Sequence, residues 1–160
     1  MKINNRSNIY IKRKQSRGFT LVEVAVSLLA FSVVVVIFAS SVLMAEKSAH
    51  VNGQYAQAIS LCQHKIDQAR AVGFGQLNDE SLLTGEIVDS VIGDSVYSFA
   101  DQDSVADYLP RPEAATLAIE KPYDGDTSKA RVTVTITWHP AAYQNKTNTV
   151  TLAAIITNVE

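Results

Sequence analysis

A run of 22 uncharged residues, from Val24 to Ala45, constrains this chain more than any other feature of its sequence. Thirteen of these residues are Leu, Ile, Val or Phe. As an α-helix the run would span about 33 Å, which matches a bilayer hydrocarbon core of roughly 30 Å. The rest of a 160-residue chain cannot build a core that would bury such a run on all sides. The sequence therefore predicts a membrane-inserting helix and excludes a uniformly soluble globule.

The charges on the two sides of this run differ in sign. Residues 1–18 contain six basic side chains and no acid, whereas residues 19–160 contain 8 basic and 16 acidic ones, a net charge of −8. The positive-inside rule puts the basic N-terminus in the cytoplasm and the residues after the run outside it. An acidic body repels phosphate, so no nucleic-acid partner is expected. The single cysteine, Cys62, excludes a disulfide framework and a cysteine-based zinc site.

Glu23 separates the possible interpretations of a basic segment followed by an apolar run. One interpretation is a secretory signal peptide, for which Ala39-Ser40-Ser41 offers a small-residue cleavage site, although the run exceeds the usual apolar region of about 7–15 residues. Another is a plain single-pass anchor. Neither needs a carboxylate beside the spanning segment, where an acid is costly and usually functional.

The residues around Glu23 read Gly18-Phe19-Thr20-Leu21-Val22-Glu23, between the basic leader and the uncharged run. This arrangement resembles the type III signal of type IV pilins and type II secretion pseudopilins, over about residues 8–45. The resemblance implies cleavage by a prepilin peptidase between Gly18 and Phe19, followed by methylation of the new Phe19 amine. It also implies that Glu23 meets the Phe19 amine of a neighbouring subunit during assembly.

The same resemblance implies a structural subunit. The residues themselves contain no nucleophile-elbow or metal-ligand motif, so no enzymatic activity, no cofactor and no metal is expected. Its expected partners are the prepilin peptidase, other pilins or pseudopilins, the inner-membrane assembly platform and the membrane itself. The expected location is the inner membrane, with the N-terminus in the cytoplasm, and then a periplasmic or cell-surface filament. The rival interpretation is an anchored or secreted extracytoplasmic binding module that is not processed as a pilin.

Helical spacing continues beyond the apolar run. Apolar residues recur at steps of three and four along one stripe, which comprises Val51, Tyr55, Ala58, Ile59, Cys62, Ile66 and Ala69. Gly73 and Gly75 are the signals for the C-terminal end of this helix. The spacing predicts one helix from about Phe19 to Val72. The domain boundaries expected from this pattern are a leader at 1–18, a transmembrane or filament-core helix at 19–45, an amphipathic half at 46–73 and a globular head at 74–160.

The head has its clearest signals at the C-terminus. Residues 131–138 alternate apolar residues with threonine, and residues 147–159 do so less regularly, which predicts an antiparallel hairpin packed on the helical stripe. These strands resemble the C-terminal part of minor pilins and minor pseudopilins. Upstream, the pattern predicts a strand at Val96–Phe99 and irregular chain at 74–93. Residues 101–129 are expected to form a loop, because they contain three prolines and many acids. The fold class expected is α+β.

Other candidate residues carry weaker signals. Asp101, Asp103 and Asp107 could belong to a calcium site, since some members of the resembled family bind calcium in the head, but their spacing fails the EF-hand pattern and favours solvated loops. Cys62 on the apolar stripe is expected to pack in the core, with an intermolecular disulfide or a reactive thiol as the alternative. Trp138 is expected to anchor the core, with a partner-binding aromatic as the alternative. The three histidines are too far apart in sequence to suggest a shared metal.

Overall fold

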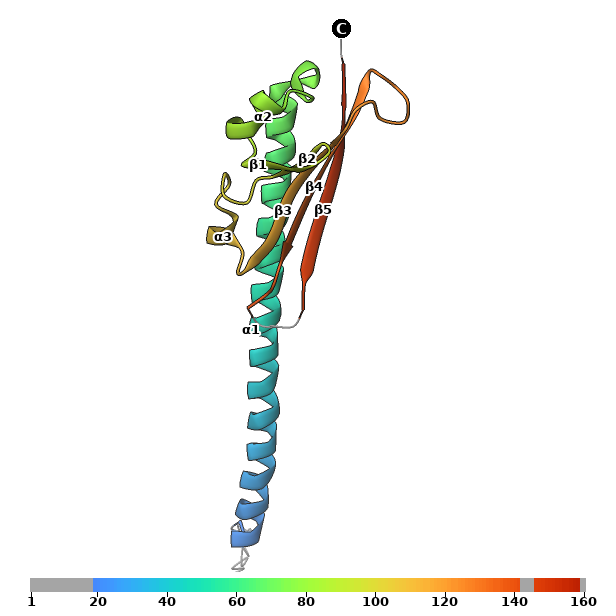
Figure 1. Ribbon diagram of the computed structural model, residues 1–160. Helices are drawn as coiled ribbons and strands as arrows, with labels where there is room; N and C mark the ends of the chain where they lie inside the picture. Colours follow the sequence, from blue (N-terminus) through green and yellow to red (C-terminus); the bar gives the residue numbers. More distant parts are fainter. Residues whose placement is uncertain (1–18, 142–145, 159–160) are drawn as a thin grey trace, which may run out of the picture. The chain divides into compact units, whose positions relative to one another are not determined.

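The computed structural model describes residues 19–141 and 146–158 (Figure 1). A long N-terminal helix is followed by a five-stranded antiparallel sheet, which confirms the predicted α+β class. The elements in chain order are α1 (Leu21–Val72), the 3-10 turn η1 (Phe74–Gln76), α2 (Glu80–Glu86), β1 (Ser90–Gly93), β2 (Val96–Ser98), α3 (Val105–Tyr108), β3 (Pro112–Glu120), β4 (Lys129–Trp138) and β5 (Asn148–Thr157). The chain divides into two compact units, and the boundary between Leu43 and Met44 lies within α1.

In the first unit, α1 is exposed on every side from Leu21 to Leu43. Within the described residues, α1 is the one helix long and apolar enough to cross a membrane, with a mean hydropathy of 2.7 over its most apolar window. A helix that is apolar all round has no soluble face of its own. This unit therefore needs lipid or other apolar helices around it.

The second unit contains the rest of α1 and the sheet, whose strand order β1-β2-β3-β4-β5 follows the chain. The predicted C-terminal hairpin is confirmed: β4 pairs with β5 over ten residues without a register shift, from Lys129 opposite Thr157 to Trp138 opposite Asn148. Alternate β4 side chains are buried, namely Ala130, Val132, Val134, Ile136 and Trp138. These side chains and the buried stripe of α1 belong to one hydrophobic core.

The helical stripe is largely as predicted. Four of its members are fully buried or nearly so: Ala58, Cys62, Ile66 and Ala69. Ile59 was assigned to the stripe but is exposed, so that assignment is wrong. The helix ends at Val72 because Gly73 follows with a φ of 87° and a ψ of 152°, a conformation that glycine adopts at little cost and other residues rarely adopt.

The loop predicted at 101–129 is wrong, because β3 lies inside it and pairs with both β2 and β4. The prolines that suggested a loop lie at the margins of β3. Pro112 is its first residue, where a missing N–H is tolerated, and Pro122 follows its end. Inside the strand, Ala115, Leu117 and Ile119 alternate as the buried positions. Alanine has a low strand propensity, so the alternation was easy to miss.

The irregular connection predicted at 74–93 is also partly wrong. It contains η1, α2 and β1. Asp79 caps α2, since its carboxylate accepts hydrogen bonds from the backbone N–H groups of Ser81 and Leu82. Asp79 in front of an apolar pair is a helix-start signal that the sequence contained.

Candidate functional site

The junction between leader and helix is the first candidate site. Gly18 lies outside the described residues, whereas Phe19 and Thr20 precede α1 and are exposed. Phe19 has 79% of its surface exposed. The ordered helix thus begins two residues after the cleavage point that the sequence predicted.

Thr20 fixes the start of α1. Its hydroxyl accepts a hydrogen bond from the Glu23 backbone N–H at 3.2 Å, and its carbonyl accepts one from Val24 at 3.1 Å. Both contacts are those of an N-cap residue. The spacing Thr-x-x-Glu is the sequence signature of a capped helix start, so this role could have been found from the sequence.

The Glu23 side chain makes no hydrogen bond and no ion pair with the residues that the structure describes. It lies in the first turn of α1, where the positive end of the helix dipole favours a carboxylate. Among the described residues this partial charge is the one favourable partner that the carboxylate has. The geometry therefore leaves the carboxylate open to a cation outside the described chain.

The apolar part of α1 contains four serines, all bonded within the helix. Their hydroxyls donate to carbonyls four residues earlier at 2.7 to 3.0 Å: Ser27 to Glu23, Ser32 to Leu28, Ser40 to Val36 and Ser41 to Ile37. These bonds satisfy polar groups that would otherwise be costly in lipid. The serines are therefore compatible with a membrane or with a filament core.

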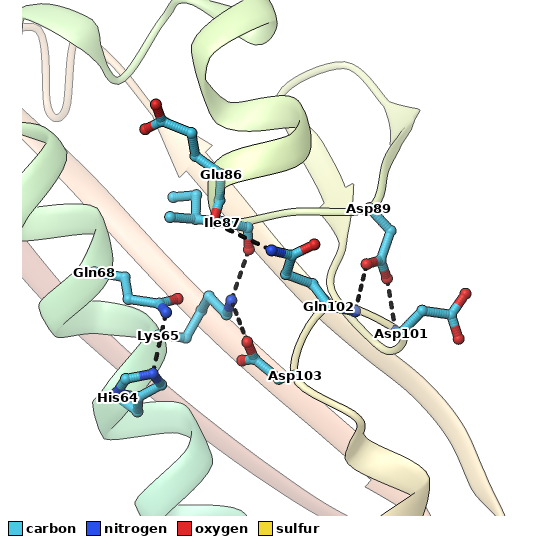
Figure 2. A network of polar contacts seen from close by, with 9 residues as sticks. All are labelled: His64, Lys65, Gln68, Glu86, Ile87, Asp89, Asp101, Gln102 and Asp103. Atoms are coloured by element: carbon cyan, nitrogen blue, oxygen red, sulfur yellow. Dashed lines mark hydrogen bonds and ion pairs between the residues drawn. The ribbon is translucent and has the colours of Figure 1, made fainter.

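A polar network inside the second unit was not found from the sequence (Figure 2). Lys65 lies on the buried side of α1 with its side chain fully buried. Its Nζ donates to Asp103 Oδ1 at 2.9 Å and to the Ile87 carbonyl at 2.6 Å, and it lies 4.9 Å from the centre of the Phe99 ring. Burial lowers the pKa of the Lys65 ammonium, while the hydrogen bond and the charge of Asp103 oppose that shift. The network ties α1 to two loops.

The acids considered for calcium take part in this network or lie beside it. Asp103 is only 8% exposed and its second oxygen, Oδ2, has no hydrogen-bond partner among the described residues, so Lys65 compensates its charge. Asp89 accepts hydrogen bonds from the backbone N–H groups of Asp101 and Gln102 at 2.8 and 2.6 Å, as Figure 2 shows. Residues 19–141 and 146–158 contain no group of three or more side chains arranged to hold a metal ion. Of the three acids considered for calcium, Asp103 thus has a structural partner, Lys65.

Cys62 and Trp138 lie in the core, as predicted. Burial raises the pKa of the Cys62 thiol to about 11. Trp138 donates its Nε1–H to Gln54 Oε1 at 3.3 Å and contacts Tyr55 edge-on, with ring centres 5.1 Å apart. The described part of the chain brings none of its histidines together: His50 and His64 lie on α1, and His139 follows β4 beside Glu113.

Comparison with known proteins gives one match and two negative results. Residues 13–45 match the model described as the prokaryotic N-terminal methylation motif. No curated protein and no solved structure matches the chain. The matched segment covers the predicted cleavage junction, the Thr20 cap, Glu23 and the whole apolar run. The motif supports a prepilin-type signal in this chain, indicates a substrate of a pilin-type prepilin peptidase, and together with the apolar helix fits a membrane-anchored, structural pilin-type protein.

Proposed function

We propose that this chain is a minor pilin or minor pseudopilin, a structural subunit of a type IV pilus or a type II secretion pseudopilus. A prepilin peptidase cuts between Gly18 and Phe19 and methylates the Phe19 amine. Residues 1–18 are then the leader, 19–45 the transmembrane or filament-core helix, 46–73 its amphipathic half and 74–160 the extracytoplasmic head. The subunit is held in the inner membrane and then passes into the filament with other pilins, through the assembly platform.

The observation that carries this proposal is the coincidence of three features in one segment. The methylation motif spans residues 13–45, and the described helix in that segment is exposed on every side. The first turn of this helix holds the Glu23 carboxylate, which has no ion-pair partner among the described residues. A plain anchor accounts for the apolar helix but not for the acid. Assignment to the minor branch is supported by the threonine-rich C-terminal hairpin of β4 and β5.

The role proposed for Glu23 is to pair with the Phe19 amine of a neighbouring subunit. Opposite charges ~4 Å apart attract by ~4 kcal/mol at an effective dielectric near 20. Removing both groups from water offsets part of this gain. The pair therefore sets the register between subunits more than it strengthens the filament.

The processing step is tested with Gly18→Leu. A bulky side chain at the scissile bond should leave unprocessed precursor in the inner membrane, since the peptidase needs the backbone to approach closely. The measurement is the mass of the accumulated protein in the native host. Normal accumulation of the shortened form would contradict the assignment of Gly18.

The assembly step is tested with Glu23→Val, and Glu46→Gln provides the matched control at the other end of the apolar run. Glu23→Val should be inserted and processed but absent from sheared filaments, because an amine buried without its partner costs several kcal/mol. Glu46→Gln should assemble normally. Normal incorporation of Glu23→Val would count against the pairing role, and failed insertion would contradict the membrane argument.

A further inference from the structure

The outer edge of β5 lacks the features that normally protect an edge strand. Its ten residues, Asn148–Thr157, include no charged residue and no proline. It is the outermost strand of the described sheet, and among the described residues it pairs with β4 alone (Figure 1). The opposite edge, β1, is four residues long and has a register shift between Val91 and Gly93. Short length and bulges blunt an edge against pairing, whereas a long uncharged edge invites another strand.

The hydrogen-bonding pattern identifies which β5 groups face that open edge. Ile119 of β3 donates its N–H to the Ser95 carbonyl, on the β2 side, so the backbone groups of odd-numbered β3 residues point toward β2 and those of even-numbered ones toward β4. By the register of the next pairs, odd-numbered β4 residues bond to β3, and even-numbered β4 residues bond to even-numbered β5 residues. The hydrogen bond from the Asn158 N–H to the Ser128 carbonyl agrees with this pattern, since it also joins two even-numbered residues. In the described chain, therefore, no strand takes up the N–H and C=O groups of Thr149, Thr151, Ala153, Ile155 and Thr157.

A groove beside this edge offers room for side chains. It has a volume of about 360 Å³ and lies between α1 and β5, with Ile66, Leu152 and Ala154 among its walls. Three inward-facing residues of β5, Val150, Leu152 and Ala154, are only partly buried, whereas the inward-facing residues of β4 are fully buried. On the opposite face of β5, Ile155 is 53% exposed. Both faces of the edge thus have apolar surface that an added strand would cover.

The charges at the groove define the kind of strand that fits. Asp67 and Arg70 lie at the groove and are paired with each other at 3.0 Å. In the part of the chain that the structure describes, no other charged side chain lines the groove. A charged residue pointing into the groove would lose water without gaining a free partner, while a small or branched apolar residue would cover Ile66 and Leu152.

We propose that the free edge of β5 binds an extended, uncharged segment of a partner protein, which adds a sixth strand with apolar side chains at alternate positions. Main-chain hydrogen bonds along the edge supply affinity, and the groove selects the alternate side chains. The proposal rests on the geometry of the second unit alone, so it stands whether or not the leader is processed.

The test uses the full chain in detergent micelles and a labelled, end-blocked peptide of alternating valine and threonine, with binding followed by fluorescence anisotropy. Two control peptides carry either N-methyl groups on the backbone or lysine in place of valine. The N-methylated peptide keeps the apolar surface but cannot donate to the edge, so it reports partition into micelles. Saturable binding is expected for the parent peptide only.

The variants place the site on the edge. Ala153→Pro removes an outward N–H without breaking a β4 bond, and Ala153→Lys adds an edge charge; each should weaken binding by about tenfold or more. Thr133→Lys is the matched control, because Thr133 lies directly opposite Ala153 on the same sheet face but in an inner strand. It should bind as the parent chain does, and the urea midpoint of each variant checks that it folds. If Ala153→Pro does not fold, the binding measured for Ala153→Lys tests whether the site lies on the edge.

Three results would overturn the proposal. The first is the absence of saturable binding to the parent chain. The second is binding of the N-methylated peptide or the lysine peptide that is as strong as binding of the parent peptide. The third is a dimer of the full chain that Ala153→Lys abolishes, because the edge would then pair with a second copy and not with a foreign strand.

Discussion

Replacing Lys65 with methionine tests the buried ion pair of the second unit. Methionine keeps the length of the side chain and its helix propensity, but it leaves the Asp103 carboxylate buried without its cation and the Ile87 carbonyl without its donor. Breaking a buried pair on one side costs about 3–5 kcal/mol. With a slope near 1.5 kcal/mol per molar urea, the midpoint should fall by roughly 2–3 M. Fluorescence of Trp138, the single tryptophan, reports the unfolding in micelles.

Two further variants separate this explanation from a general packing defect. The double variant Lys65→Met/Asp103→Leu removes both charges and should recover most of the lost stability, because neither charge is left unpaired. Lys129→Met breaks a pair with Asp126 of the same 2.9 Å length that is exposed to solvent, and should shift the midpoint far less. An unchanged midpoint for Lys65→Met, or a double variant no more stable than the single one, would refute the reasoning.

Two other outcomes follow from shifted pKa values. The Cys62 thiol, with a pKa of about 11, should be about one part in a thousand thiolate at pH 8, so a maleimide should label it only after unfolding; rapid labelling of the folded chain would contradict its burial. Hydrogen bonds from Ser128, then from Lys129, lower the pKa of the Asp126 carboxyl, so this contact adds stability above pH 3.8 and loses it as the pH falls through the lower folded value. Ser128→Ala should raise the Asp126 pKa in an NMR titration, and an unchanged value would show that Ser128 is not the main cause.

The features that could be predicted from sequence are those encoded by neighbouring residues. The apolar run, the stripe through Cys62 and the alternation of residues 131–138 each specify an element through their own periodicity. The Thr20 cap is equally local, because Thr-x-x-Glu places both partners in one turn. The junction that the methylation motif matches was located through the resemblance of residues 18–23 to the pilin-type signal, which is also a local pattern.

The features that escaped prediction depend on residues far apart in sequence. Lys65 reads as a polar interruption of the stripe, and only the tertiary fold brings Asp103, 38 residues later, within 2.9 Å of it. The strand β3 likewise depends on its neighbours, since its alanines have little strand preference and gain stability from pairing on both sides. The open edge of β5 could not be inferred either, because a strand's place in the sheet is set by topology and not by its own pattern.

The mass of the N-terminal peptide of the protein purified from its native membrane tests the central claim most directly. The account predicts a chain that begins at Phe19 and carries one additional methyl group on its amine. A chain that retains Met1, or one that begins at Val42 after a signal-peptide cut, would contradict the assignment of this protein to the prepilin-type substrates.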